Sequence, residues 1–164
     1  MEYIAQYDSP LGLLIMISDG DALTGLRFSD EPFDPPDESP EATDLPVFAL
    51  TRTWLDTYFR GAVPGFLPPM RLRGTPFQKA VWSILLDIPY GKTVTYGSIA
   101  GRLSGGGAMS SQAVGQAVGK NPVCIIVPCH RVVGSNGRLT GYAWGLDKKE
   151  ALLAMEQGQE TRLY

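Results

Sequence analysis

The most informative segment of this 164-residue chain is Val123-Cys124-Ile125-Ile126-Val127-Pro128-Cys129-His130-Arg131. Its first five residues are apolar, and such a run predicts a buried β-strand over residues 123–127. Proline cannot extend a strand ladder, so Pro128 should direct the backbone out of the sheet. We therefore expect Cys129 to line a cavity at the end of this strand.

The chain's single histidine, His130, stands beside Cys129. A thiolate is the reactive form of cysteine, and a neighbouring His130 or Arg131 can lower the thiol pKa. Adjacent side chains of an extended chain point to opposite faces, so a bridging water between Cys129 and His130 is easier than a direct hydrogen bond. The alternative is a buried cysteine that acts as a small hydrophobic residue, and this interpretation suits Cys124.

A histidine that acts as a base needs a partner to orient it. Acidic side chains in the second half of the chain are candidates for that role, and the spacing alone does not choose among them. These residues are Asp87, Asp147, Glu150, Glu156 and Glu160.

The composition excludes several classes of protein. Two cysteines and one histidine cannot fill a four-ligand Cys/His zinc site, and two cysteines do not make a disulfide framework. The apolar run over residues 11–17 is too short to cross a membrane, and acidic Glu2 and Asp8 precede it where a signal peptide would be basic. We therefore expect a cytoplasmic protein with free thiols, no metal and no membrane partner.

The net charge of −3 hides an asymmetry between two halves of the chain. Residues 1–73 hold 5 basic and 12 acidic side chains, whereas residues 74–164 hold 9 basic and 5 acidic ones. The Gly/Pro-rich residues 61–69 separate these halves and indicate a linker. We predict a domain over residues 1–70, with an acidic, proline-rich loop at 29–44, and a second domain over residues 74–164.

The first domain has the pattern of a hairpin followed by a helix. Apolar runs at residues 13–18 and 22–28 flank the turn signal Asp19-Gly20-Asp21. From Val47 onward, apolar residues recur at helical spacing and predict one buried face. That face should comprise Leu50, Trp54, Leu55 and Tyr58.

The second domain has the outline of a helix-turn-helix. Thr75-Pro76 is a typical helix start, and shorter helices are predicted over residues 95–103 and 110–118, on either side of the glycine turn 105–107. A last helix is predicted over residues 148–157.

The segment Asn121-Pro122-Val123-Cys124-Ile125-Ile126-Val127-Pro128-Cys129-His130-Arg131-Val132-Val133 closely resembles the active-site signature of O6-alkylguanine-DNA alkyltransferases. Weaker similarity extends over nearly the whole chain, through Ser9-Pro10-Leu11-Gly12, Thr75-Pro76-Phe77-Gln78 with Val81-Trp82, and Gly141-Tyr142 with Leu146, Lys149 and Glu156. The resemblance implies an α+β protein. It would have a small N-terminal α/β domain with an antiparallel hairpin sheet, then a mostly helical, winged helix-turn-helix domain.

The resemblance also implies the activity: stoichiometric transfer of an alkyl group, chiefly methyl, from O6 of guanine to Cys129, without a cofactor. The partner would be double-stranded DNA, bound through its minor groove by a monomer. His130 would take the thiol proton through a water, Glu156 would orient His130, Asn121 would stabilise the active-site turn and Tyr96 would assist the leaving guanine. The base pocket would comprise Val118, Val132, Ala143 and Trp144, and the DNA contacts Gly97, Ser110, Ser111, Gln112, Ala113 and Ser135.

The chain departs from the family pattern at three places. Gln112 stands where the family usually inserts an arginine into the base stack, and Trp144 stands where many members have glycine. We expect weaker or more salt-tolerant DNA binding and a narrower pocket. The turn at residues 105–107 also looks longer than usual.

Three other functions fit parts of the pattern. A non-catalytic sensor of alkylated DNA would replace the reactive cysteine, which is present here. A Cys-His hydrolase would need an oxyanion hole, and nothing in the sequence points to one. A transcription factor would use the winged helix alone.

Overall fold

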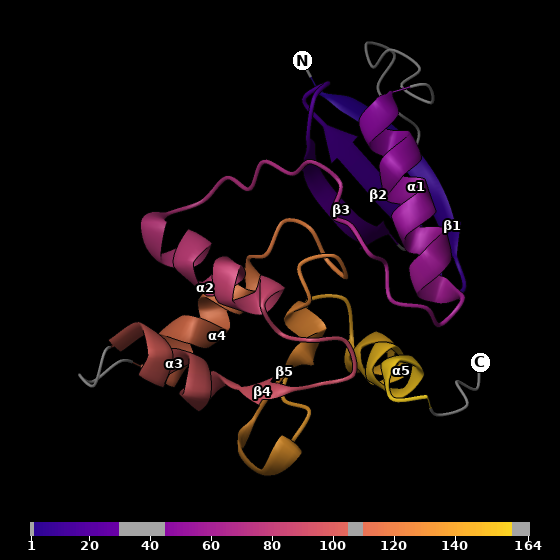
Figure 1. Cartoon of the computed structure of the whole chain (residues 1–164). Helices are drawn as coiled ribbons and strands as arrows, with labels where there is room; N and C mark the ends of the chain where they lie inside the picture. The colour runs from indigo at the N-terminus through magenta and orange to yellow at the C-terminus, as the bar shows by residue number, and fades with distance from the viewer. Residues whose placement is uncertain (1, 30–44, 105–109, 159–164) are drawn as a thin grey trace. The chain divides into compact units, whose positions relative to one another are not determined.

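The computed structural model describes residues 2–29, 45–104 and 110–158. The chain divides between Arg73 and Gly74 into two units (Figure 1). Most of the predicted acidic loop 29–44 and the whole glycine turn 105–107 lie outside the described residues. Among the described residues, no helix has the length and apolar character that a membrane crossing would need.

The first unit contains a three-stranded antiparallel sheet in the order β1-β2-β3. Its strands are β1 (Tyr3–Ser9), β2 (Gly12–Ser18) and β3 (Leu23–Ser29). The predicted hairpin is confirmed, because β2 pairs antiparallel with β3 around the turn at Asp19. The Asp19 carboxylate accepts hydrogen bonds from the backbone N–H groups of Asp21 and Ala22, both at 3.0 Å, and this closes the turn.

Helix α1 (Pro46–Phe59) packs against all three strands of this sheet (Figure 1). Its buried side chains follow the helical period and are Val47, Phe48, Thr51, Trp54, Leu55 and Tyr58. The prediction was wrong for Leu50, which lies at the edge of this stripe and is 42% exposed. The segment after α1 returns to the sheet, where the Leu23 N–H donates to the Pro69 carbonyl at 2.8 Å.

The second unit is mostly helical, as predicted. It contains α2 (Pro76–Leu86), α3 (Tyr96–Ser104), α4 (Ser111–Gly119) and α5 (Leu146–Glu156). The short strands β4 (Val94–Thr95) and β5 (Val132–Val133) pair in parallel. Together with the sheet of the first unit, these elements confirm the α+β class.

Local signals place the helices that pack together in this unit. Thr75 and Gln78 form a reciprocal capping box at the start of α2. The Ser110 hydroxyl accepts from two backbone N–H groups at the start of α4. The indole N–H of Trp82 then donates to the Ala117 carbonyl at 2.9 Å and joins α2 to α4.

The predicted strand over residues 123–127 is wrong, because these residues form a tight turn. Ile125 has a φ of 67°, which no β-strand accommodates. The Val127 N–H donates to the Val123 carbonyl at 3.1 Å, and the Ile126 N–H donates to the Cys124 carbonyl at 2.7 Å. The run is apolar because it is buried, and burial alone does not distinguish a strand from a turn.

Candidate active site

Asn121 holds the turn that leads into the site. Its side-chain oxygen accepts from the Val123 N–H at 3.0 Å, and its side-chain nitrogen donates to the Val127 carbonyl at 2.8 Å. The two bonds connect the beginning and the end of the turn, and the asparagine itself is buried. Beyond the turn, a single turn of 3₁₀ helix covers Cys129–Arg131 in place of the expected extended chain.

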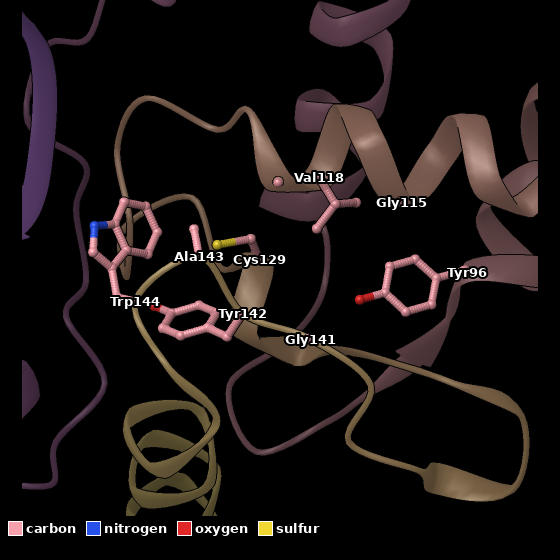
Figure 2. A pocket seen from close by; sticks show the side chains of 9 residues that line it. Tyr96, Gly115, Val118, Cys129, Gly141, Tyr142, Ala143 and Trp144 are labelled. Atoms are coloured by element: carbon pink, nitrogen blue, oxygen red, sulfur yellow. The ribbon is translucent and has the colours of Figure 1, made fainter.

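Cys129 lies in the wall of a pocket of about 240 Å³ (Figure 2). The pocket is formed within the second unit by residues of α3, α4 and the segment before α5. Its lining comprises Tyr96, Gly115, Val118, Gly119, Cys129, Gly141, Tyr142, Ala143 and Trp144. The cysteine is 4% exposed, so its thiol meets a mainly apolar surface that excludes bulk water.

Burial raises the pKa of the Cys129 thiol to about 11. Hydrogen bonds from the side chains of Asn121 and Tyr142, and the positive charge of Lys149, lower this pKa but do not offset burial. The expectation that His130 and Arg131 would lower the Cys129 pKa is therefore wrong for the resting protein. Desolvation of a charged sulfur dominates in this position, so the cysteine rests as a thiol.

Behind the cysteine, His130, Glu156 and Arg131 form a buried polar cluster. The His130 Nε2 atom lies 2.5 Å from one Glu156 oxygen, and the Arg131 Nε–H donates to the other at 2.7 Å. The backbone N–H of Gly91 donates to the same Glu156 carboxylate at 3.3 Å. Arg131 also donates to the Ile88 carbonyl at 2.7 Å, which attaches the cluster to the segment that follows α2.

The cluster keeps the carboxylate charged and the imidazole neutral. Burial alone would raise the pKa of Glu156, but hydrogen bonds and charge from His130 and Arg131 outweigh it and lower that pKa to about 2. Burial lowers the pKa of His130, although Glu156 opposes this effect. An ionised Glu156 accepts a hydrogen bond from the Nε2–H group of His130, so the neutral imidazole presents Nδ1 as a base.

Glu156 is the acid that the structure selects from the five candidates of the sequence. Helix α5 buries Lys149, Leu152, Leu153 and Glu156 along one face. Asp87, Asp147 and Glu150 are exposed, and Glu160 lies outside the described residues. A charged residue at the same helical face as two leucines was the available signal for this selection.

No role was predicted from the sequence for Lys149, although it lies on the same buried face of α5 as the two leucines and Glu156. Its side chain is 0% exposed, and its ammonium group donates to the Gly141 carbonyl at 2.9 Å. The Lys149 Nζ atom also lies 5.9 Å from the centre of the Tyr96 ring. Burial lowers the pKa of Lys149, while interaction with Cys129 raises it.

Two family models cover both units of the chain. Residues 3–66 match the 6-O-methylguanine DNA methyltransferase, ribonuclease-like domain, and residues 76–158 match the 6-O-methylguanine DNA methyltransferase, DNA binding domain. A methylated-DNA--protein-cysteine methyltransferase of Mycobacterium tuberculosis is 43% identical over 93% of this chain and 90% of its own length. One from Haemophilus influenzae is 41% identical over 94% of this chain and 86% of its own length.

The chain belongs to the 6-O-methylguanine DNA methyltransferase family. The crystal structure of Mycobacterium tuberculosis OGT in complex with DNA is 39% identical and has a TM-score of 0.82. That similarity covers 98% of this chain and 96% of the other. The family resemblance of the sequence is thus confirmed.

In this methyltransferase, most of the residues expected at the base pocket line the cavity around Cys129. Val118 lies on α4, and Ala143 and Trp144 lie on the segment before α5, with Tyr96 at the opposite side (Figure 2). Val132 is the exception. It is 0% exposed in β5 and does not belong to the lining.

The residues expected at the methyltransferase's DNA surface occupy different places. Ser111 and Gln112 line a more open groove of about 460 Å³ along α4, together with Gln116 and Thr140. This groove shares Tyr96, Gly115 and Gly141 with the pocket, so the two are continuous. Ser110 caps α4, Ala113 is half-buried on it, and Gly97 and Ser135 are exposed outside both linings.

Proposed function

We propose that this protein repairs DNA by moving an alkyl group, chiefly methyl, from O6 of guanine to its own Cys129, once per molecule and without a cofactor. The observation that carries the proposal is the Cys129 thiol in an apolar pocket, with a His130–Glu156 pair buried behind it. The match to both methyltransferase domains supports the same reaction.

Proton removal is the first step of the proposed reaction. The thiol proton passes through a water molecule to Nδ1 of His130, and Glu156 stabilises the imidazolium that forms. The three donors on Glu156 keep it ionised and fix the ring orientation. Because burial disfavours the Cys129 thiolate, the His130–Glu156 pair is needed to take up the thiol proton before the sulfur can attack.

Transfer of the alkyl group follows. The Cys129 sulfur forms a bond to the alkyl carbon, the bond from that carbon to guanine O6 breaks, and its electron pair stays on the base. The Tyr96 hydroxyl gives a proton to the leaving guanine and is reprotonated when His130 loses its own proton. The thioether that remains on Cys129 does not hydrolyse, so the protein acts once.

The DNA partner is proposed from the groove along α4. O6 of guanine lies inside a duplex, so the base has to be flipped out at a cost of about a few kcal/mol. We infer that α4, with small residues at Ala113 and Gly115, enters the minor groove, which is about 6 Å wide. We infer that the protein acts on DNA as a monomer. The required free thiol fits a reducing, cytoplasmic environment.

Counting the transferred groups tests this proposal. A duplex that carries radiolabelled O6-methylguanine is incubated in excess with the protein, and protein-bound label is measured at completion. We expect a plateau near one methyl group per protein, unchanged in Cys124→Ala. Turnover beyond one equivalent with no bound label would indicate a hydrolase, and duplex binding without transfer would indicate a sensor.

A further inference from the structure

Among the described residues, the side chains that line the groove along α4 are all uncharged. They belong to Tyr96, Ser111, Gln112, Gln116 and Thr140, with Gly115 and Gly141 between them. The sequence of α4 holds no basic residue either. Double-stranded DNA carries one negative charge per about 1.7 Å of its axis, and proteins bind it largely by placing lysine or arginine against phosphates. A groove that accepts DNA therefore needs a cation at its edge.

Arg138 lies beside the wall of this groove. It follows the turn Ser135–Gly137, and its backbone is extended, with a φ of −69° and a ψ of 135°. Its side chain is exposed, that of Leu139 is half-buried and that of Thr140 is exposed again. This alternation is typical of an extended segment, in which residues two apart point to the same side. Arg138 therefore shares a side with Thr140, which lines the groove.

Gly134 lies next to both of these side chains. A Cβ atom placed on Gly134 would lie 2.8 Å from Thr140 Cγ2 and 3.6 Å from Arg138 Cβ. The Gly134 N–H donates to the Arg138 carbonyl at 2.8 Å and closes the turn. Within the turn, Asn136 and Gly137 have positive φ values of 64° and 75°. These restraints hold the start of the Arg138 side chain beside Thr140 before any ligand arrives.

Arg138 is the basic side chain best placed to serve this groove. Arg102, at the end of α3, lies 4.0 Å from the carboxylate of Asp87, which offsets its charge. Lys120 follows the C-terminal end of α4, whereas the last α4 residue in the groove lining is Gln116. Within the described ranges of the chain, the ion pairs do not include Arg138. Its charge is therefore available to a ligand.

We propose that Arg138 binds a backbone phosphate of DNA at the edge of the α4 groove and supplies there the positive charge that Gln112 does not. The inference rests on the proposed function, because its ligand is the duplex proposed above. The guanidinium is a planar fork of N–H donors that matches the oxygens of a phosphate. A phosphate contact carries no sequence information, so Arg138 contributes affinity and orientation but does not select neighbouring bases.

The test measures how DNA affinity depends on salt. A fluorescent duplex without a lesion is titrated with the parent protein, Arg138→Gln and Arg138→Lys between about 50 and 200 mM salt. Loss of one phosphate contact reduces the slope of log affinity against log salt by about 0.9. We expect this reduction in Arg138→Gln, so that its affinity deficit shrinks about 3.5-fold across the range. Arg138→Lys keeps the charge and should keep the parent slope.

Two controls show whether the effect belongs to this position. Arg60→Gln removes the same charge from the exposed end of α1 in the first unit and should leave the slope unchanged. The affinity deficit of Arg138→Gln should be equal on two duplexes of different sequence, because phosphates are the same in both. An unchanged slope in Arg138→Gln would overturn the proposal, as would a deficit that depends on sequence or an equal change in Arg60→Gln.

Methyl transfer separates this inference from the proposed function. Transfer from an O6-methylguanine duplex is measured in parallel for the parent protein. If the parent transfers methyl and Arg138→Gln keeps the parent slope, the phosphate contact alone is refuted. If Arg138→Gln has the reduced slope and the parent transfers no methyl, the phosphate contact is upheld and the repair function is refuted.

Discussion

The His130 Nε2 atom lies 2.5 Å from a Glu156 oxygen, and both side chains are buried. This pair determines which imidazole nitrogen remains as a base. Replacing Glu156 by Gln removes the negative charge that orients the ring and stabilises the imidazolium. We predict that Glu156→Gln slows single-turnover methyl transfer by about 10²-fold or more. Glu150→Gln, an exposed change on the same helix, is the control and should transfer at the parent rate.

The depressed pKa of Glu156 also predicts how stability depends on pH. Its pKa is about 2 in the folded protein against 4.5 as the reference, so the folded state favours the charged form. The resulting stabilisation, about 3 kcal/mol, is complete above the reference value and is lost as the pH falls from about 4.5 to about 2. The free energy of unfolding is measured by urea denaturation at pH 7 and at pH 3. The control Glu150→Gln should lose stability between these pH values, and Glu156→Gln should lose far less.

Asn121 predicts a stability effect that originates in the turn. Asn121→Ala removes two buried hydrogen bonds and leaves the Val123 N–H and the Val127 carbonyl without these partners. We expect a loss of about 2–4 kcal/mol in unfolding free energy, measured by urea denaturation. Asn121→Asp keeps the acceptor for the Val123 N–H group. Its loss of unfolding free energy should be smaller at acidic pH than at neutral pH. Equal stability of Asn121→Ala and the parent would refute the bracing role.

Gln112 predicts the salt dependence of DNA binding. It is exposed near the start of α4 and lines the open groove. Each phosphate contact by a cation adds about 0.9 to the slope of log affinity against log salt. Gln112→Arg should therefore bind more tightly at low salt and steepen that slope by about 0.9. Gln157→Arg adds the same charge at the end of α5, is the control and should not change the slope. If Gln112→Arg also leaves the slope unchanged, this groove does not meet DNA.

Trp144 predicts the range of alkyl groups accepted. Its indole occupies part of the pocket wall that glycine would leave open (Figure 2). Trp144→Gly should speed transfer of a benzyl group relative to methyl, measured with duplexes that carry each lesion. Leu146→Ala, an exposed change nearby, is the control and should leave the ratio of benzyl to methyl transfer rates unchanged. If Trp144→Gly also leaves this ratio unchanged, Trp144 does not limit the range of alkyl groups.

Local chemistry made much of the fold predictable. The Asp19 turn and the helix start at Thr75-Pro76 depend on neighbours in sequence, and both were predicted from the chain. Residues 123–127 were not predictable in this way. A positive φ at Ile125 depends on the Asn121 bonds and on burial, which an apolar run does not reveal.

The site shows the same division. Cys129 and His130 are adjacent in sequence, so their partnership could be proposed without coordinates. The family resemblance pointed to Glu156, but a choice from spacing alone required knowing which face of α5 is buried. The direction of the Cys129 pKa could not be predicted either, because neighbouring charges were visible in the sequence and the depth of burial was not.

The mass of the protein after reaction tests the central claim most directly. The protein is incubated with an O6-methylguanine duplex, and the intact mass and the peptide that contains Cys129 are measured by mass spectrometry. We predict a gain of one methyl group per molecule, located on Cys129, retained in Cys124→Ala and absent in Cys129→Ala. An unchanged mass of the parent protein, or a methyl group on any other residue, would contradict the account.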